Sequence, residues 1–138
     1  MFAVVALYLF TPVADPAALK ADLEALCTAH GVIGGLIVAS EGVNGTIAGA
    51  ISTTDSSDSD DSPKTETSSP IDHILAYFGS QGMLAGMNIK KSTNAVAPFH
   101  RLRVSCKKEI VTMRCDHNLN MNQRGTYVRP AAWNALVQ

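Results

Sequence analysis

The stretch "ASEGVNGTIAG", from Ala39 to Gly49, sits between two apolar runs and contains an Asn44-Gly45 pair. Asn-Gly is the strongest short-range signal for a tight β-hairpin, because both residues accept the positive φ angles of a type I′ turn. We therefore expect strands over 32–39 and 45–49 to pair as a hairpin around this dipeptide. The turn needs only that pair, and the neighbours could form a binding edge, with Glu41 either pairing with a basic strand or orienting a substrate. These neighbours are Glu41, Gly42 and Thr46.

The segments on either side of this hairpin alternate between strands and helices. The run "FAVVALYLF" at 2–10 is continuous in apolar β-forming residues, which predicts a central strand covered on both faces or nearly so. A first helix is expected to begin at the N-cap Asp15 and to end at Gly31. A second is expected to begin at the capping box of Ser69 and to end before Gly79. Two further strands are expected at about 87–91 and 99–111.

This order of elements predicts a single α+β domain. Strand, helix, strand, strand, helix, strand is the ferredoxin-like or acylphosphatase-like βαββαβ sandwich, and the seventh element adds one extra strand. Two helices are expected to cover one face of an antiparallel sheet. The 138 residues have room for one such domain, expected over 1–112, and the remaining 113–138 are expected to form an extended tail that ends in the start of a helix.

A polar insert interrupts the domain at 52–69. Its sequence, "STTDSSDSDDSPKTETSS", contains no apolar residue, so burial cannot offset the entropy lost on ordering it. We expect a disordered surface loop. A phosphorylated regulatory segment and a tolerated insertion between two elements both fit this composition, and the tolerated insertion is the favoured interpretation.

Charge is divided unevenly along the chain. Residues 1–85 contain two basic and ten acidic residues, a net charge of −8, whereas 86–138 contain nine basic and two acidic residues, a net charge of +7. The overall net charge of −1 hides this division. A cationic surface in the last third of the chain indicates an anionic partner.

The densest basic segment is "FHRLRVSCKKEIV" at 99–111. Strand alternation places Leu102, Val104 and Cys106 toward the core. The opposite side carries a ladder of polar side chains, with further basic residues expected nearby. The ladder consists of Arg101, Arg103, Ser105 and Lys107, and the nearby residues are Lys90, Lys91, His100 and Lys108. Such a ladder suits contacts to RNA phosphates, and a solvated sheet face partly neutralised by acidic residues is the other interpretation.

The sequence does not predict a catalytic, metal or cofactor site. Three cysteines without CxxC spacing favour cytosolic free thiols over disulfides or zinc. No second histidine or acidic residue has ligand spacing with His100, which favours a structural or phosphate-facing role. Cys106 is expected in the core, and Cys115 is expected to be an ordinary exposed thiol. The longest apolar run is less than half the length of a membrane span, so we expect a cytoplasmic protein without a membrane segment.

The order of elements also resembles that of acylphosphatases, which makes the hydrolysis of acyl phosphates an alternative function. That activity depends on an arginine-containing phosphate loop between the first strand and the first helix. The corresponding connection is "TPVADP" at 11–16, which has no arginine and little capacity to bind an anion.

Three motifs taken together resemble one family. They are "EGVNGT" at 41–46, "PFHRLRVSCKKEIVTM" at 98–113 and "GTYVRPAAWNAL" at 125–136. In this order they are similar to the amino-terminal part of the rhodanese-domain proteins that act as tRNA uridine hydroxylases, which oxidise the wobble uridine to 5-hydroxyuridine. The resemblance implies an acylphosphatase-like first domain that helps to bind the tRNA anticodon arm. It also implies that 113–138 is a linker to a rhodanese domain with the reactive cysteine, which this chain does not contain.

The family's loop and basic strand carry over to particular positions of this chain. The resemblance implies a substrate-binding or RNA-binding set that consists of Glu41, Asn44, Gly45, Thr46, His100, Arg101, Arg103, Lys107 and Lys108. The polar insert departs from the pattern, as does Arg114-Cys115 where a glycine is expected. Neither Cys106 nor Cys115 precedes the glycine-containing loop of a rhodanese site, so this chain alone is not expected to be active. An accessory domain of a sulfurtransferase, without RNA affinity, is the alternative to tRNA binding.

Overall fold

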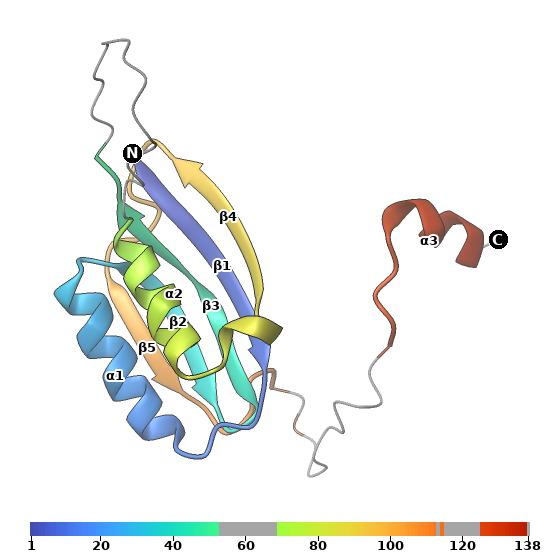
Figure 1. Ribbon diagram of the computed structural model, residues 1–138, viewed down its shortest axis with the longest axis horizontal. Helices are drawn as coiled ribbons and strands as arrows, with labels where there is room; N and C mark the ends of the chain where they lie inside the picture. Colours follow the sequence, from blue (N-terminus) through green and yellow to red (C-terminus); the bar gives the residue numbers. More distant parts are fainter. Residues whose placement is uncertain (53–68, 113, 115–124, 138) are drawn as a thin grey trace.

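The computed structural model describes residues 1–52, 69–112, 114 and 125–137, and Figure 1 shows their arrangement. All seven predicted elements are present, together with a short 3-10 helix before the fourth strand and a third helix near the end. In chain order they are β1 (Phe2–Phe10), α1 (Pro16–Ala29), β2 (Ile33–Ala39), β3 (Gly42–Ala50), α2 (Pro70–Ser80), η1 (Leu84–Gly86), β4 (Asn88–Asn94), β5 (Leu102–Cys106) and α3 (Pro130–Leu136). β5 is shorter than expected, because its partner β2 ends at Ala39.

The strands form one five-stranded sheet in the order β4-β1-β3-β2-β5. Neighbouring strands are antiparallel except β2 and β5, which run parallel, so the expected antiparallel sheet is wrong in this one pairing. β4 ends at Asn94 opposite Phe2, at the end of the sheet where β1 and β2 both begin. A chain that crosses the sheet at that end enters β5 in the same direction as β2, which explains the parallel pairing.

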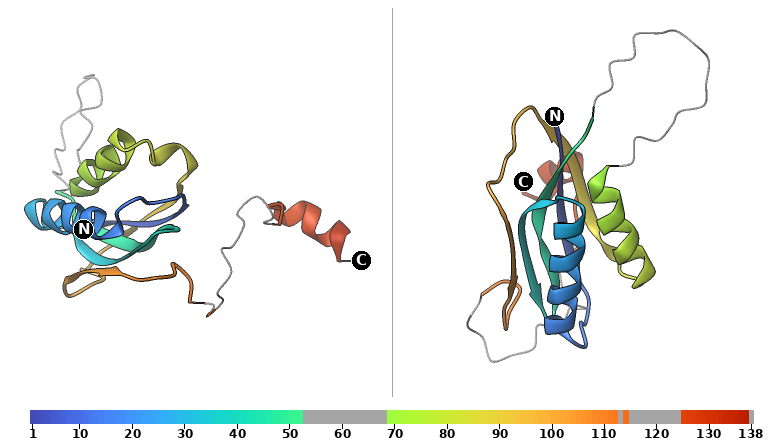
Figure 2. Two further views of the ribbon diagram at one scale, coloured as in Figure 1. Left: turned by 90° about the horizontal axis from the view of Figure 1, so that it is seen from below. Right: turned by 90° about the vertical axis from the view of Figure 1, so that its left-hand side faces the viewer.

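Both long helices lie on the same side of the sheet, as Figure 2 shows, which confirms the predicted α+β sandwich. Burial of apolar side chains between the two layers is the main force that holds them together. The buried side chains include Leu19, Leu23 and Cys27 from α1, Ile71, Ile74 and Phe78 from α2, and Leu7, Leu36 and Ile47 from the strands. Burial also raises the pKa of the Cys27 thiol to about 11, so this thiol is protonated near neutral pH.

Local caps fix where the helices begin and end. The Asp15 carboxylate accepts a backbone hydrogen bond of 3.0 Å from the first turn of α1, as predicted. Ser69 and Asp72 form the predicted capping box of α2, in which Ser69 N donates to Asp72 Oδ2 at 2.7 Å. α2 continues past Gly79, and the left-handed residue that follows the helix is Gly82, with a φ of 70°.

β1 is covered by helices on one face, and no residue of the strand is exposed, which agrees with the expectation of a strand covered on both faces or nearly so. Val5, Leu7 and Leu9 are buried, while the alternate side chains of Phe2–Phe10 are half-buried. We call the side of the sheet away from α1 and α2 the open face. The connection between β4 and β5 runs along this side, as Figure 2 shows, and Ala48 on the open face is fully buried. The continuous apolar run in β1 therefore reflects full burial on the helix side and half-burial on the open face.

The β2–β3 hairpin is confirmed, but its turn is not at Asn44-Gly45. The two strands are joined by the two-residue turn Ser40-Glu41, and Asn44-Gly45 lies inside β3, paired with β1 on one side and β2 on the other. The carbonyl groups of Glu41 and Ser40 accept hydrogen bonds from Thr11 N and Val13 N at 3.0 and 2.9 Å. Contact with the segment after β1, rather than Asn-Gly chemistry, therefore holds the turn in place.

Two glycines of the same stretch have structural roles at the new positions. Gly42 has a φ of 146°, and a Cβ there would collide with the Leu9 carbonyl oxygen. A Cβ on Gly45 would collide with the Gly35 carbonyl oxygen and would lie 2.8 Å from Leu36 Cα. Gly45 is therefore required for the close approach of β2 and β3, and not for a turn.

Some expectations concern residues outside the described ones. The predicted disorder of the insert falls on 53–68, and Cys115 lies within 115–124. In the described part of the tail, 125–129 precede α3 without regular structure, as expected, and every residue of α3 is exposed. None of the described helices has the length and apolar composition needed to cross a membrane.

Substitution of Gly45 tests its place inside β3. We expect Gly45→Ala to lower the free energy of unfolding by about 1–3 kcal/mol, because the new methyl group must displace the backbone of β2. Gly35→Ala is the matched control, since a Cβ at Gly35 meets no atom within 4 Å. Its effect should stay within about 0.5 kcal/mol. Urea unfolding measures both variants, and equal stabilities would contradict the packing of β2 against β3 at Gly45.

Candidate nucleic-acid interface

The open face brings the Asn-Gly motif and the basic strand into one surface. Two rows of neighbouring residues run across it from β4 to β5. One row contains Asn88, Tyr8, Asn44, Ile37 and Ser105, and the next contains Lys90, Ala6, Thr46, Gly35 and Arg103. Ala6 and Gly35, on the strands either side of β3, have small or no side chains, so little protrudes from the open face at these two positions. The sheet therefore presents polar groups in its centre and cations at both edges.

A shallow depression of about 340 Å³ lies over β2, β3 and β5, and we call it the Arg103 depression. Asn44 and Gly45 line it from β3, and Arg103 and Lys107 line it from β5 and the residues that follow. Gly35 lies between these two groups and has open space above its Cα atom. Four of the predicted site residues thus line one depression.

A second depression of about 320 Å³ lies over β1, β3 and β4, and we call it the Tyr8 depression. Asn44 and Gly45 line both depressions, which therefore adjoin each other on β3. The Tyr8 ring packs edge-on against Phe10, with centroids 4.7 Å apart and an interplanar angle of 90°. Other lining residues include Thr46, Lys90 and, at the rim, Tyr127, which is 92% exposed.

The cations of the open face lack carboxylate partners within the described residues. The sole ion pair there joins Lys20 to Glu24 on α1, at 3.1 Å. Lys90, Arg103 and Lys107 are all exposed. Within the described residues no ion pair neutralises these three cations, and such a cluster of exposed cations favours an anionic ligand.

Glu41 makes a structural contact and lines neither depression. Its Oε2 accepts a hydrogen bond from Ile110 N at 3.2 Å, and Lys107 N donates to Val38 O at 2.9 Å. Together these contacts hold the chain that follows β5 against the β2–β3 hairpin. Among the described residues Glu41 forms no ion pair with a basic side chain, and its contact with the segment after β5 is the hydrogen bond from the Ile110 backbone.

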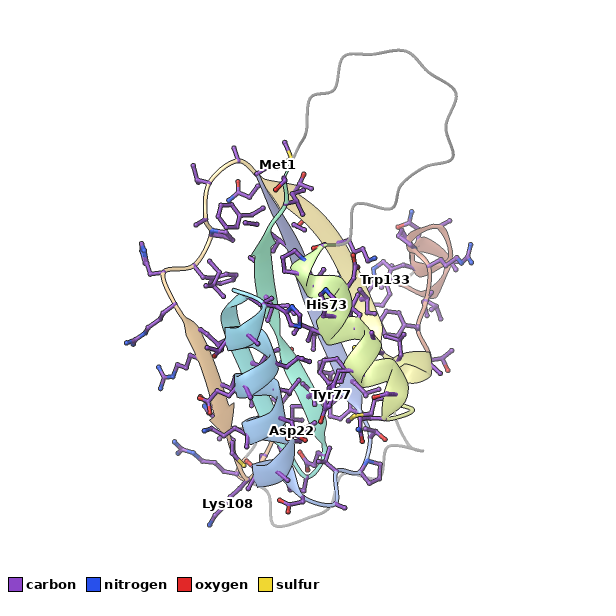
Figure 3. All side chains as sticks on the ribbon, turned by 60° about the vertical axis from the view of Figure 1, so that its left-hand side comes forward. Met1, Asp22, His73, Tyr77, Lys108 and Trp133 are labelled. Carbon is purple, nitrogen blue, oxygen red and sulfur yellow. The ribbon has the colours of Figure 1, made fainter. Side chains whose placement is uncertain are left out.

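Of the other basic residues, only Lys90 lines one of these two depressions, the Tyr8 depression. The others lie outside both. His100, Arg101 and Lys108 are exposed near the ends of β5, and Figure 3 shows Lys108 at one extremity of the domain. Lys90 and Lys91 belong to β4, at the opposite edge from β5 (Figure 1). Their expected proximity to the basic strand is therefore wrong, because β1, β3 and β2 lie between the two edges.

The side alternation predicted for the basic strand is confirmed by its pairing with β2. Leu102 and Val104 pack against the core, and Arg103 faces the other way, over the open face. Cys106 lies on the helix side, as predicted, but it is exposed and not part of the core. It is the last residue of an edge strand, where the cover of the helices ends.

Sequence reasoning missed Tyr8 and Gly35 as parts of this surface. Alternation within 2–10 contained the signal for Tyr8, but the continuous apolar run suggested that both faces of the strand were covered. Gly35 lies beside Arg103 only because β5 pairs with β2. That long-range pairing has no local signature in the sequence.

The connection between β1 and α1, where an acylphosphatase requires its arginine loop, lies beside two carboxylates. A depression of about 330 Å³ there is lined by Asp15 and Asp22, and none of the described residues that line it is cationic. Tyr77 donates a hydrogen bond to Asp22 Oδ2 at 3.0 Å and links α2 to α1 (Figure 3). Burial, together with this carboxylate, raises the pKa of Tyr77. Such a site repels an acyl phosphate.

Metal-binding groups do not gather elsewhere in the part of the chain that the structure describes. No three histidine, cysteine, aspartate or glutamate side chains come close enough there to hold an ion.

These elements define an acylphosphatase-like α+β domain, and comparison with known protein families supports that class. Residues 2–59 match the family described as the UPF0176 acylphosphatase like domain.

The chain is also similar, along nearly its whole length, to curated proteins named tRNA uridine(34) hydroxylase. It is 42% identical over 137 residues to that of Jannaschia sp., 40% over 134 residues to that of Mesorhizobium japonicum and 41% over 137 residues to that of Sinorhizobium fredii. The alignments cover 99%, 97% and 99% of this chain but 40%, 38% and 38% of the relatives. The similarity to tRNA uridine hydroxylases that the motifs indicate is confirmed, and the chain spans about two fifths of the length of these relatives.

Substitution of Glu41 tests whether its hydrogen bond with Ile110 N stabilises the fold. We expect Glu41→Ala to lower the free energy of unfolding by about 1–3 kcal/mol, because it leaves the Ile110 N–H without its acceptor. Glu41→Gln keeps a side-chain oxygen at the same position and should lose less than Glu41→Ala. Chemical denaturation of both variants tests the contact. Two variants as stable as the parent chain would show that Glu41 does not anchor the segment after β5.

Proposed function

We propose that this chain is the tRNA-binding, amino-terminal domain of an enzyme that hydroxylates the wobble uridine of tRNA in the cytoplasm. The observation that carries the proposal is the Arg103 depression, where the motif residues Asn44 and Gly45 lie beside Arg103 and Lys107. Similarity to proteins named tRNA uridine(34) hydroxylase supplies the substrate class. Because those relatives are longer, we propose that a rhodanese domain beyond this region provides the reactive cysteine.

The proposed contacts follow from the chemistry of each side chain. Basic groups contact phosphates of the anticodon arm, and this set comprises Arg101, Arg103, Lys107, Lys108 and the imidazole of His100. Asn44 and Thr46 offer an amide and a hydroxyl group to the nucleoside. Gly45 and Glu41 act through structure, by keeping β2 close to β3 and by holding the segment after β5. We assign no catalytic residue, metal ion or cofactor to this chain.

Salt dependence of binding tests the proposed phosphate contacts. Each contact releases about one condensed counterion, so the logarithm of the affinity falls linearly with the logarithm of the salt concentration. Fluorescence anisotropy with a labelled tRNA anticodon stem-loop should show binding to the 138-residue chain at low salt. Arg103→Ala and Lys107→Ala should each weaken binding and reduce the salt slope by about 1.

Lys20→Ala is the matched control for this experiment. It removes one positive charge from α1, on the helix side of the sheet, and should leave the salt slope unchanged. If the Arg103→Ala slope equals that of the parent chain, the basic strand does not contact phosphates. Absence of binding at low salt would contradict the proposed function and would favour the sulfurtransferase accessory domain.

A further inference from the structure

We infer that the open face binds an unpaired stretch of RNA that lies across the strands, with nucleobases in the Tyr8 and Arg103 depressions. This inference rests on the proposed function and specifies which part of an RNA the domain contacts. It adds Tyr8, Gly35 and Lys90 to the binding surface, none of which belongs to the basic strand.

The arrangement of cations argues for a ligand that spans the sheet. Lys90 lies on β4, and Arg103 lies on β5, with three strands between them in the same row. Neighbouring strands are about 4.8 Å apart, so the two edges are separated by about 19 Å. An RNA strand that crosses the sheet places phosphates near both edges. A ligand that followed β5 alone would leave Lys90 unused.

The two depressions suit bases that are not paired with a second strand. Each is shallow, at about 320 and 340 Å³, and each opens directly on the side chains of the sheet. Base faces and Watson–Crick edges reach such a surface only where the nucleotides are unpaired, since a duplex presents mainly phosphates and sugars. The geometry therefore favours a loop or a single strand over a helix.

Tyr8 supplies an aromatic surface near the middle of the sheet. It is half-buried, and the edge-on contact with Phe10, at a centroid distance of 4.7 Å, limits the orientations of its ring. Bases stack on aromatic side chains of this kind with little dependence on sequence. Tyr8 is therefore the residue that we expect to hold a base in its depression.

Asn44 supplies hydrogen-bonding groups between the two bases. Neither its amide nor the Thr46 hydroxyl forms a side-chain hydrogen bond with any other described residue. An amide offers both donors and acceptors, which suits the polar edge of a nucleobase. Because Asn44 lines both depressions, one side chain can contact two successive nucleotides.

A binding comparison between RNA forms tests this inference. The probes are a fluorescent unstructured ten-nucleotide oligouridine and a blunt RNA duplex of ten base pairs, each with the 138-residue chain at low salt. We expect the single strand to bind at least about tenfold more tightly than the duplex. Tyr8→Leu should weaken single-strand binding about tenfold and leave duplex binding unchanged.

Gly35→Val provides a second variant without any change of charge. Its side chain would fill part of the Arg103 depression, while a Cβ at this position meets no atom within 4 Å. Valine also favours strands, so the variant should fold as the parent chain does. We expect single-strand binding to fall about tenfold, and Asn44→Ala should lower it as well. Lys20→Ala again serves as the control that leaves binding unchanged.

The outcomes separate this inference from the proposed function. If the duplex binds as tightly as the single strand, or if Tyr8→Leu and Gly35→Val bind like the parent chain, the inference fails while RNA binding stands. If neither RNA binds, both the inference and the proposed function fail. If poly-glutamate binds to the same variants in the same order and RNA does not, the open face is a site for an acidic protein segment, which also overturns the inference.

Discussion

The close approach of β2 and β3 at Gly45 is the constraint on which the rest of the surface depends. The missing side chain allows the Leu36 backbone and side chain to pack against β3 without a gap. β3 is the middle strand of the sheet, so its pairing with β1 and β2 fixes the positions of both. With the core side filled by Val43 and Ile47, the alternate residues Asn44 and Thr46 must face the other side. The same residues that stabilise the fold thus determine which polar groups the open face presents.

The position of β5 adds the charges to this surface. β5 could join the sheet only at the free edge beside β2, because β4 occupies the edge beside β1. Parallel pairing with β2 sets Arg103 beside Gly35 and Ser105 beside Ile37. A glycine at that point leaves the cation in contact with an open depression rather than with another side chain. The order of the strands therefore places the Arg103 cation beside the open space above Gly35.

Much of the fold could be predicted from the sequence, because local signals determine it. The caps at Asp15 and Ser69 and the alternation in the basic strand each reflect interactions within a few residues. The errors came from interactions between distant segments. Asn44-Gly45 was assigned to a turn because Asn-Gly usually forms one, whereas Thr11 and Val13 hold the turn at Ser40-Glu41.

The candidate site was predictable only in part, for the same reason. Asn44, Gly45, Arg103 and Lys107 were identified from motifs, and the structure brings them together. The distribution of Lys90 and Arg103 to opposite edges could not be deduced, since it depends on strand order. Tyr8 lies within a continuous apolar run, and the sequence does not show that one face of this strand is buried under the helices while the other is half-buried. The resemblance to longer relatives indicated a substrate class, but the geometry of the open face had to come from the structure.

The proposed function requires that the open face, and not the helix face, contacts RNA. Backbone amide chemical shifts of the isotope-labelled chain, followed by NMR during titration with a short unpaired RNA, test it most directly. We expect the largest shift changes at residues of the open face, namely Tyr8, Gly35, Asn44, Thr46, Lys90 and Arg103. Changes centred instead on α1 and α2, around Asp22 and Tyr77, would contradict it.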